Sequence, residues 1–600
     1  MRPGSFFRAA SACGVTALTL ALASSSGAAP ASKSAPGPPP GPQAEEHVLS
    51  NGMKLVLVPR HLSPTVSGGW VAHVGSANER PGITGISHLF EHMMFKGTHV
   101  IGTRDYDKDV RLIDAQERLR DEMRAETSKL RAEQRRGEIE DITKPESKTP
   151  RMKALEASFD SLVAEQRANM VKNEFDQVLQ KNGGTFINAF TNEDQTFYFE
   201  TLPANKLELW FWLESDRLKN RVFREFYSER DVVFEERRLR TESTPTGKFQ
   251  ESFDSVFWDS SPYGWPVVGW PTDVASITKA QADEYFSLFY APQNLTAILV
   301  GDFEPRATLA MAEKYLGSIP AGTRPAPEMI TAEIKPLAEK RFYGEAETNP
   351  AVTVRWHAVP FVHRDAPALL VVESALNSPN GRLQRKLVLG SALATSARAN
   401  ADPRKYEGLF EVEAEAREGH TPEEVEQGIY GELDRLKKEP IPADELQSVK
   451  NRYLADKYRQ LSSNFQIMLF YGVADGRGSW RDFDRIDQAV QKVTAEDVMR
   501  VANTYFTREG RAVAIWTRKA GATAEDPAIA ALPDAAKGMV RQMLGRIDQA
   551  TDAAQIQQML TRLDGMAGQI PPEMKPAMDY IRGKAQARME QLTPADSGKK

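Results

Sequence analysis

The sequence contains almost no cysteine. Cys13 is the single cysteine in 600 residues, and it lies in an N-terminal segment that we expect to be removed. A mature chain without cysteine excludes a disulfide framework, a thiolate metal site and a cysteine nucleophile. Any metal must therefore be held by histidine, aspartate or glutamate.

Long hydrophobic runs and a strong net charge are also missing. No apolar run reaches about 18 residues, so no transmembrane helix is predicted. The formal net charge of -6 gives no sign of a nucleic-acid-binding surface. Apolar residues make up 41% and charged residues 26%, which is ordinary for a soluble globular protein. A chain of 600 residues is too long to fold around a single hydrophobic core, so two or more domains are expected.

The N-terminus is predicted to be a secretory signal peptide over residues 1–28. Two arginines precede a largely apolar stretch, Ala9 to Ala23, and small residues lie at the expected cleavage site near Ala28. This interpretation predicts a periplasmic or secreted protein. A mitochondrial transit peptide is the alternative, because no acidic residue occurs before Glu45. The nearly continuous apolar run favours the secretory interpretation.

The rest of the chain is predicted to be of α+β class with two homologous sheet-and-helix domains. Thr278 and Thr494 each begin a helical pattern that leads to a buried strand, which is the echo expected of a duplication. The tail is rich in Ala, Gln and Met at helical spacing, and both a helical bundle and a disordered extension fit it. The expected segments are a Pro-rich linker at 29–45, a first sheet-and-helix domain at 46–325, a linker at 326–339, a second homologous domain at 340–518 and a helical tail at 519–600.

Residues 104–175 differ in character from the remainder of the first domain. They are dense in charged side chains, and apolar residues recur only sparsely at helical spacing. The pattern predicts an inserted helical hairpin that is solvated on most of its faces. A docking arm for a partner is the functional alternative.

The string His88-Leu89-Phe90-Glu91-His92 carries the predicted chemistry. On a helix, His88 and His92 lie on one face, where both imidazoles can bind one zinc ion. Glu91 can reach a zinc-bound water and take its proton as general base. Such a string arises by chance in roughly one chain of this kind per hundred. Apolar neighbours bury this helix, and buried histidines need partners such as a metal.

A catalytic zinc normally has three protein ligands and one open position. The third ligand is expected on the acidic helix that begins near Glu229. Glu229 and Glu236 are seven residues apart and share a face, so one could bind the metal while the other orients a histidine. Spacing alone does not choose among Glu229, Glu235 and Glu236.

At this point the chain resembles the inverted-motif zinc metallopeptidases, the group of pitrilysin, insulin-degrading enzyme and mitochondrial processing peptidase, in their bacterial processing-peptidase-like branch. The likeness spans about residues 46–518. The matching residues are Gly85 to Thr98, Gly183-Gly184, Asn188 to Thr191, Tyr198, Glu229 to Val233, Glu236, Tyr263-Gly264, Gly269 and Tyr290 to Leu295.

The resemblance implies a function and roles for single residues. It implies a zinc-dependent endopeptidase with Glu236 as third ligand of one zinc ion and Glu229 as the acid behind the ligands. The two domains would close around a clam-like chamber. Unfolded peptides would add as a strand to a sheet edge at Asn188 and Ala189.

One departure from the family pattern concerns the second half. Self-sufficient relatives carry an Arg and a Tyr there, and our alignment places Val388 and Thr395 at the two positions. This absence predicts a heteromeric partner of the same fold that lacks the zinc motif and supplies both residues. Misalignment, or replacement by Arg385 or Arg398, is the alternative. A non-catalytic scaffold subunit is the alternative to an enzyme as a whole.

Overall fold

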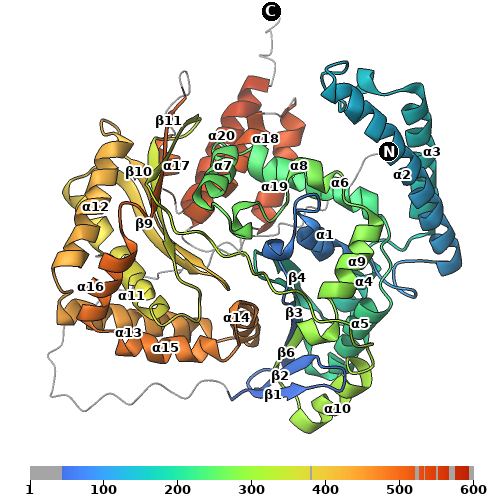
Figure 1. Ribbon diagram of the computed structural model, residues 1–600, viewed down its shortest axis with the longest axis horizontal. Coiled ribbons are helices and arrows are strands. Elements are labelled where there is room, and N and C mark those ends of the chain that lie inside the picture. Colours follow the sequence, from blue (N-terminus) through green and yellow to red (C-terminus); the bar gives the residue numbers. More distant parts are fainter. Residues whose placement is uncertain are drawn as a thin grey trace, which may run out of the picture.

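The computed structural model describes residues 43–378, 381–519, 526–530, 532, 534–548, 550, 552–566 and 574–592. Two mixed sheets with helices around them confirm the predicted α+β class (Figure 1). No helix among the described residues is long and apolar enough to cross a membrane. The predicted signal peptide lies outside the described residues.

The first sheet has six strands in the order β1-β2-β6-β3-β5-β4. β2 and β6 are parallel, and the other neighbours are antiparallel. The strands are β1 (Glu45–Val48), β2 (Lys54–Pro59), β3 (Thr65–Ala72), β4 (Thr185–Thr191), β5 (Thr196–Pro203) and β6 (Leu295–Gly301).

The second sheet repeats this topology without a counterpart of β1. Its order is β7-β11-β8-β10-β9, and β7 and β11 are the parallel pair. In both sheets the first strand of the repeat therefore pairs with the last, and the third strand lies at an edge. The strands are β7 (Lys340–Ala346), β8 (Ala351–Ala358), β9 (Ala394–Pro403), β10 (Gly408–Ala416) and β11 (Arg511–Arg518).

The helices before the last strand of each repeat begin in the same way. Thr278 and Thr494 cap α9 and α16, and Gln281 and Asp497 return the hydrogen bond in two capping boxes. The shared topology and the shared caps bear out the duplication. The domain limits drawn above remain a proposal, which the absence of helix and strand in the described residues 316–339 supports.

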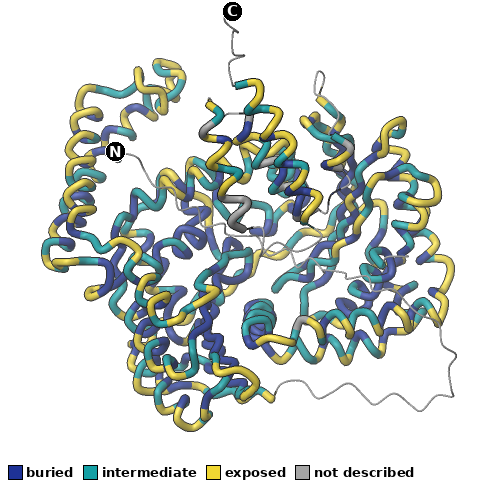
Figure 2. The backbone as a smooth tube through the Cα atoms, turned by 180° about the vertical axis from the view of Figure 1, so that it is seen from behind, coloured by how far each residue is buried: buried dark blue, intermediate teal, exposed yellow. Residues whose placement is uncertain are grey.

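Each sheet has one face covered by helices of its own half. The first sheet packs against α1 (Ile86–Met93), α5 (Leu207–Lys219), α6 (Phe226–Arg237), α9 (Lys279–Phe289) and α10 (Pro305–Tyr315), with the short α8 (Pro271–Val274) beside α6. The second sheet packs against α11 (Ala366–Asn377), α12 (Pro422–Lys438), α13 (Ala443–Gln460), α15 (Asp482–Lys492) and α16 (Ala495–Tyr505). Buried residues follow these layers (Figure 2).

The opposite face of each sheet is covered by a helix of the other half. Ile467 and Met468 of α14 (Asn464–Arg477) pack on strands of the first sheet. Phe253 and Phe257 of α7 (Gly247–Phe257) pack on β11 of the second sheet. Figure 1 shows α14 between the two halves. Each of these two apolar cores therefore contains residues from both halves of the chain.

The predicted helical hairpin is present as α2 (Tyr106–Arg135) and α3 (Pro150–Asn169), followed by α4 (Glu174–Lys181). It projects from the first half, and much of its surface is exposed (Figures 1 and 2). Its base is buried: Gln166 donates a hydrogen bond to Asp109 at 3.0 Å. The C-terminal tail forms α17 (Pro527–Ala530), α18 (Asp534–Asp548), α19 (Ala553–Met566) and α20 (Lys575–Leu592) around an apolar core of its own.

Candidate metal centre

A left-handed glycine and a buried glutamate fix the start of helix α1. Gly85 precedes it with φ 90°, a conformation that favours glycine. The carboxylate of Glu79 accepts hydrogen bonds from the backbone N–H groups of Gly85 at 2.7 Å and Ser87 at 2.8 Å. These contacts satisfy amides that a helix start leaves free. Burial raises the pKa of Glu79 to about 8. Sequence reasoning did not single out Glu79.

Two histidines of α1 and one glutamate of α6 converge on one point. Their ligand atoms all lie within 4.8 Å of one another. The Nε2 atoms of His88 and His92 lie 3.8 Å and 3.3 Å from Oε2 of Glu236. The other carboxylate oxygen of Glu236, Oε1, forms an ion pair with the guanidinium of Arg240 at 2.5 Å. This geometry brings together the predicted ligands His88, His92 and Glu236.

The cluster fits a zinc ion. Two ligands at 2.0–2.1 Å from a tetrahedral zinc lie about 3.4 Å apart, close to the observed separations. Burial lowers the pKa of His88 to about 3, so its imidazole is neutral and can donate a lone pair. Burial opposes ionisation of Glu236, but the hydrogen bond and charge of the histidines lower its pKa to about 2. A neutral imidazole, as His88 has, and a carboxylate, as Glu236 has, are ligands that zinc takes. Burial lowers the pKa of His92, but hydrogen bonds with Glu229 and Glu236 raise it to about 9, so this ring must first lose a proton.

Glu229 and Glu235 of α6 make different contacts from those of Glu236. Oε2 of Glu229 lies 3.5 Å from Nδ1 of His92, and Oε1 pairs with Lys96 at 2.5 Å. Glu229 thus contacts the ring nitrogen that faces away from the cluster, as an acid that orients a ligand does. Glu235 points elsewhere: it pairs with Arg238 at 2.9 Å, and 58% of its side chain is exposed.

Glu91 lies beside the cluster without joining it. Its side chain is buried at 7% exposure and forms a hydrogen bond with Thr191 of β4. Burial raises the pKa of Glu91, and the charge of His92 lowers it in part. A carboxylate with this affinity for a proton, next to a metal position, can act as a general base.

The predicted substrate residues lie on β4, the edge strand of the first sheet. Asn188 pairs with Phe199 of β5 and Ala189 with Tyr198. Ala189 is buried, and Asn188 is half-buried. Because β4 ends the strand order, its outer backbone edge has no strand neighbour among the described residues.

A buried arginine, which the sequence analysis did not single out, joins the two helices that carry the predicted metal ligands. Arg224 is fully buried one residue before the cap of α6. Its guanidinium donates to the carbonyls of Lys96 at 3.2 Å and Ile101 at 2.9 Å, in the loop after α1. It also forms an ion pair with Asp109 of the hairpin. The base of the insertion therefore helps to place both helices. Nothing in the pattern of charged residues distinguishes Asp109 from its solvated neighbours.

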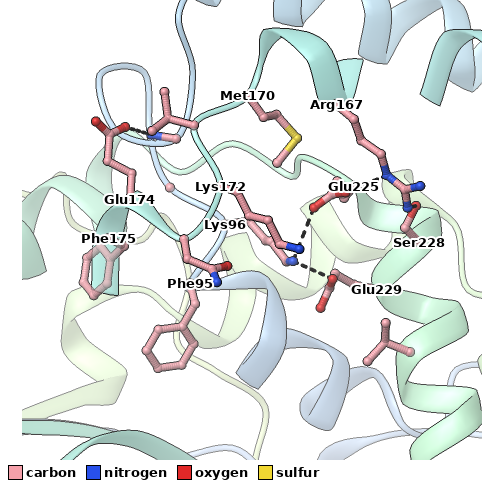
Figure 3. A pocket seen from close by; sticks show the side chains of 15 residues that line it. Phe95, Lys96, Arg167, Met170, Lys172, Glu174, Phe175, Glu225, Ser228 and Glu229 are labelled. Carbon is pink, nitrogen blue, oxygen red and sulfur yellow. Dashed lines mark hydrogen bonds and ion pairs between the residues drawn. The ribbon is translucent and has the colours of Figure 1, made fainter. Parts of the chain in front are cut away.

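A cavity of about 460 Å³ is lined in part by Glu229, the acid that contacts His92 (Figure 3). Lys96 lies between Glu229 and Glu225, and Arg167 of α3 pairs with Glu225 at 3.1 Å. The end of the hairpin therefore forms one wall of a space next to the metal position.

The segment aligned with the missing Arg and Tyr belongs to the second half. Val388 lies in a π-helical segment, Gln384–Gly390, and packs against the apolar core. Thr395 is exposed at the start of β9, and its hydroxyl donates to Glu415 at 2.8 Å. Neither side chain offers a cation or a phenol.

Fold and site together define a duplicated α+β protein whose first half holds three residues that could bind one metal ion. The insulinase model (peptidase family M16) matches residues 55–116, and the model of the M16 inactive domain matches residues 276–453. The chain belongs to the M16 peptidases.

Several relatives are named zinc proteases, and one is a subunit of mitochondrial-processing peptidase. The zinc protease PqqE of Helicobacter pylori is 25% identical over 477 residues, which are 78% of this chain and 90% of that protein. The beta subunit of mitochondrial-processing peptidase from Lentinula edodes is 20% identical over 60% of this chain and 64% of its own.

Solved structures confirm the fold. A protease from Helicobacter pylori matches with a TM-score of 0.65 and 23% identity, over 79% of this chain and 100% of its own. The periplasmic protease PqqL from Escherichia coli matches with a TM-score of 0.59 and 16% identity, over 81% of this chain and 49% of its own.

Proposed function

We propose that the chain is a zinc-dependent endopeptidase that hydrolyses unfolded peptides outside the cytoplasm. The convergence of His88, His92 and Glu236 within 4.8 Å, with Glu91 beside them, carries this proposal. The names of the relatives support protease activity and zinc. The expected signal peptide and the periplasmic relative support the location.

His88, His92 and Glu236 would hold the zinc ion, which supplies a Lewis acid that lowers the pKa of a water molecule to near 7. Glu91 then takes a proton from the attacking water on its carboxylate, and burial strengthens this carboxylate as a base. Glu229 holds the ring of His92 through Nδ1 and fixes which nitrogen faces the metal.

The substrate would bind as an added strand along β4. The outer edge of β4 offers backbone N–H and C=O groups to an extended peptide, a mode that recognises unfolded chains with little regard for sequence. The hydrogen bond from β4 to Glu91 places this edge next to the proposed base. The amide of Asn188 would hold the peptide backbone there.

A second subunit would complete the site. In our alignment Val388 and Thr395 occupy the positions where self-sufficient members of the family carry Arg and Tyr, and both make contacts within their own half. We infer that a heteromeric partner of the same fold, without the zinc motif, supplies the two side chains.

The test is cleavage of a mixed pool of unfolded peptides by the purified zinc-loaded chain, beside its Glu91→Gln variant. Cleavage that disappears in the variant would establish a self-sufficient metallopeptidase and remove the need for a partner. One bound zinc without cleavage would point to the missing subunit. A chain that binds no zinc would favour the non-catalytic scaffold.

A further inference from the structure

We propose that Phe186 and Phe465 form an aromatic platform that binds a bulky apolar side chain of the peptide, several residues away from the bond that is cut. This inference rests on the proposed peptide binding at β4, and it adds a site of selectivity to that function. The platform joins one residue from each half of the molecule.

The first observation is an irregularity in β4. Thr185 pairs with Thr201 and Asn188 with Phe199, so two residues of β4 lie opposite the single Glu200 of β5. The extra residue forms a bulge, a device that redirects a side chain at a sheet edge. Phe186 lies in this bulge with φ 53°, a left-handed conformation that a bulky side chain rarely adopts.

Two neighbouring side chains of β4 lie on opposite faces of the sheet. Ile187 packs against the core that contains the apolar residues of α1. Phe186 instead turns to the face that α14 covers, where its ring stacks on Phe465 with centroids 4.6 Å apart and planes at 20°. This is the arrangement that the alternation of side chains along a strand predicts, so Phe186 lies on the same face as Phe190, which also packs on the α14 side.

Phe186 remains open to solvent although it is stacked. Its exposed fraction is 63%, which is large for an aromatic side chain in a strand. Phe465 also packs against Phe199 of β5, with ring centroids 5.5 Å apart. The pair is therefore a supported surface with an open side at the edge where a peptide would add.

The position of the platform predicts which part of a peptide reaches it. Thr191 contacts Glu91, so the reacting bond would lie near that end of β4. Phe186 lies five residues earlier, one of them in the bulge, which at about 3.3 Å per residue is on the order of 13–17 Å away. A peptide residue four or five positions from the cut, on the α14 side of the added strand, would contact the platform. Aromatic and large aliphatic side chains suit it, and a well-placed aromatic pair should strengthen binding about three- to tenfold.

The experiment measures peptide binding rather than cleavage. The protein is the zinc-loaded full chain carrying Glu91→Gln, which would leave peptides intact. The probes are fluorescein-labelled ten-residue peptides of Ala, Ser and Lys in which one Phe is moved along the sequence, and fluorescence anisotropy gives each Kd. One Phe position should bind about three- to tenfold more tightly than the all-Ala peptide.

Phe186→Asn is the informative variant, because Asn tolerates a left-handed backbone and should preserve the bulge. In this variant the ratio between the Phe and Ala peptides should fall to about one, and Phe465→Ala should reduce it as well. Leu389→Ala, another exposed apolar residue at 68%, should keep the ratio. Peptides that bind without any preferred Phe position, or a preference that survives Phe186→Asn, would overturn the platform alone. If no peptide binds at all, the proposed peptide-binding function fails as well.

Discussion

Replacing Glu229 by Gln separates the metal ligand from the acid behind it. The substitution keeps the shape of the side chain but removes the charge that lies 3.5 Å from Nδ1 of His92 and 2.5 Å from Nζ of Lys96. Loss of such a contact typically weakens metal binding 10- to 100-fold, or about 1.4–2.7 kcal/mol. Glu236→Gln should weaken it further, because it removes a charged ligand.

The assay is a competition titration of zinc against a chromophoric chelator at fixed pH. Glu235→Gln is the matched control, since Glu235 precedes the ligand on the same helix but pairs with Arg238 at 2.9 Å. It should bind zinc as the unaltered chain does. An equal loss in Glu229→Gln and Glu235→Gln, or no loss in Glu229→Gln, would refute the assignment of roles on α6.

Three further predictions concern the frame of the site. Asp109→Ala leaves the buried Arg224 without its carboxylate, so unfolding in urea followed by tryptophan fluorescence should show a loss of about 3–5 kcal/mol; a loss below about 1 kcal/mol would contradict the ion pair. In the metal-free chain burial lowers the pKa of His92, but hydrogen bonds with Glu229 and Glu236 raise it to about 9. Zinc needs the neutral ring, so binding should release about one proton at pH 7 and tighten as pH rises toward 9; calorimetry in two buffers of different ionisation enthalpy measures this, and zero release would contradict it. Gly85→Ala places a Cβ 2.6 Å from the carbonyl of Val268 at φ 90° and should lower both the melting temperature and the zinc content. Gly82→Ala has a similar φ of 95° with no atom within 4 Å, so it should show only the cost of a left-handed backbone, about 1–2 kcal/mol; equal losses of stability in the two variants would argue against the close contact.

The sequence allowed a prediction of elements whose signal is local. His88 and His92 lie within one helical turn of each other, so their common face follows from spacing alone. The hairpin followed from charge and periodicity, and the duplication from two similar helix starts. Residues 104–175 were assigned as one hairpin, and the structure ends its second helix at Asn169 before a separate short helix, α4.

Features that depend on distant contacts were not predictable. The choice of Glu236 over Glu235 depends on how α6 is rotated against α1, which spacing does not encode. Arg224 and Asp109 are ordinary charged residues in a charged region, and only the fold makes them buried partners. The bulge at Phe186 depends on the register between β4 and β5, which the order of residues in β4 does not encode.

Because α7 and α14 each cover the sheet of the other half, the order of synthesis affects how the protein folds. During synthesis the first sheet is complete once β6 ends at Gly301, but Ile467 and Met468, which cover its second face, are made only about 165 residues later. The apolar face of the first sheet that contains Val56, Val71 and Ile298 is therefore uncovered until α14 has been synthesised. Such a face invites aggregation in a half-made chain. A chain exported before it folds would avoid this interval, since both halves would then be present when folding begins.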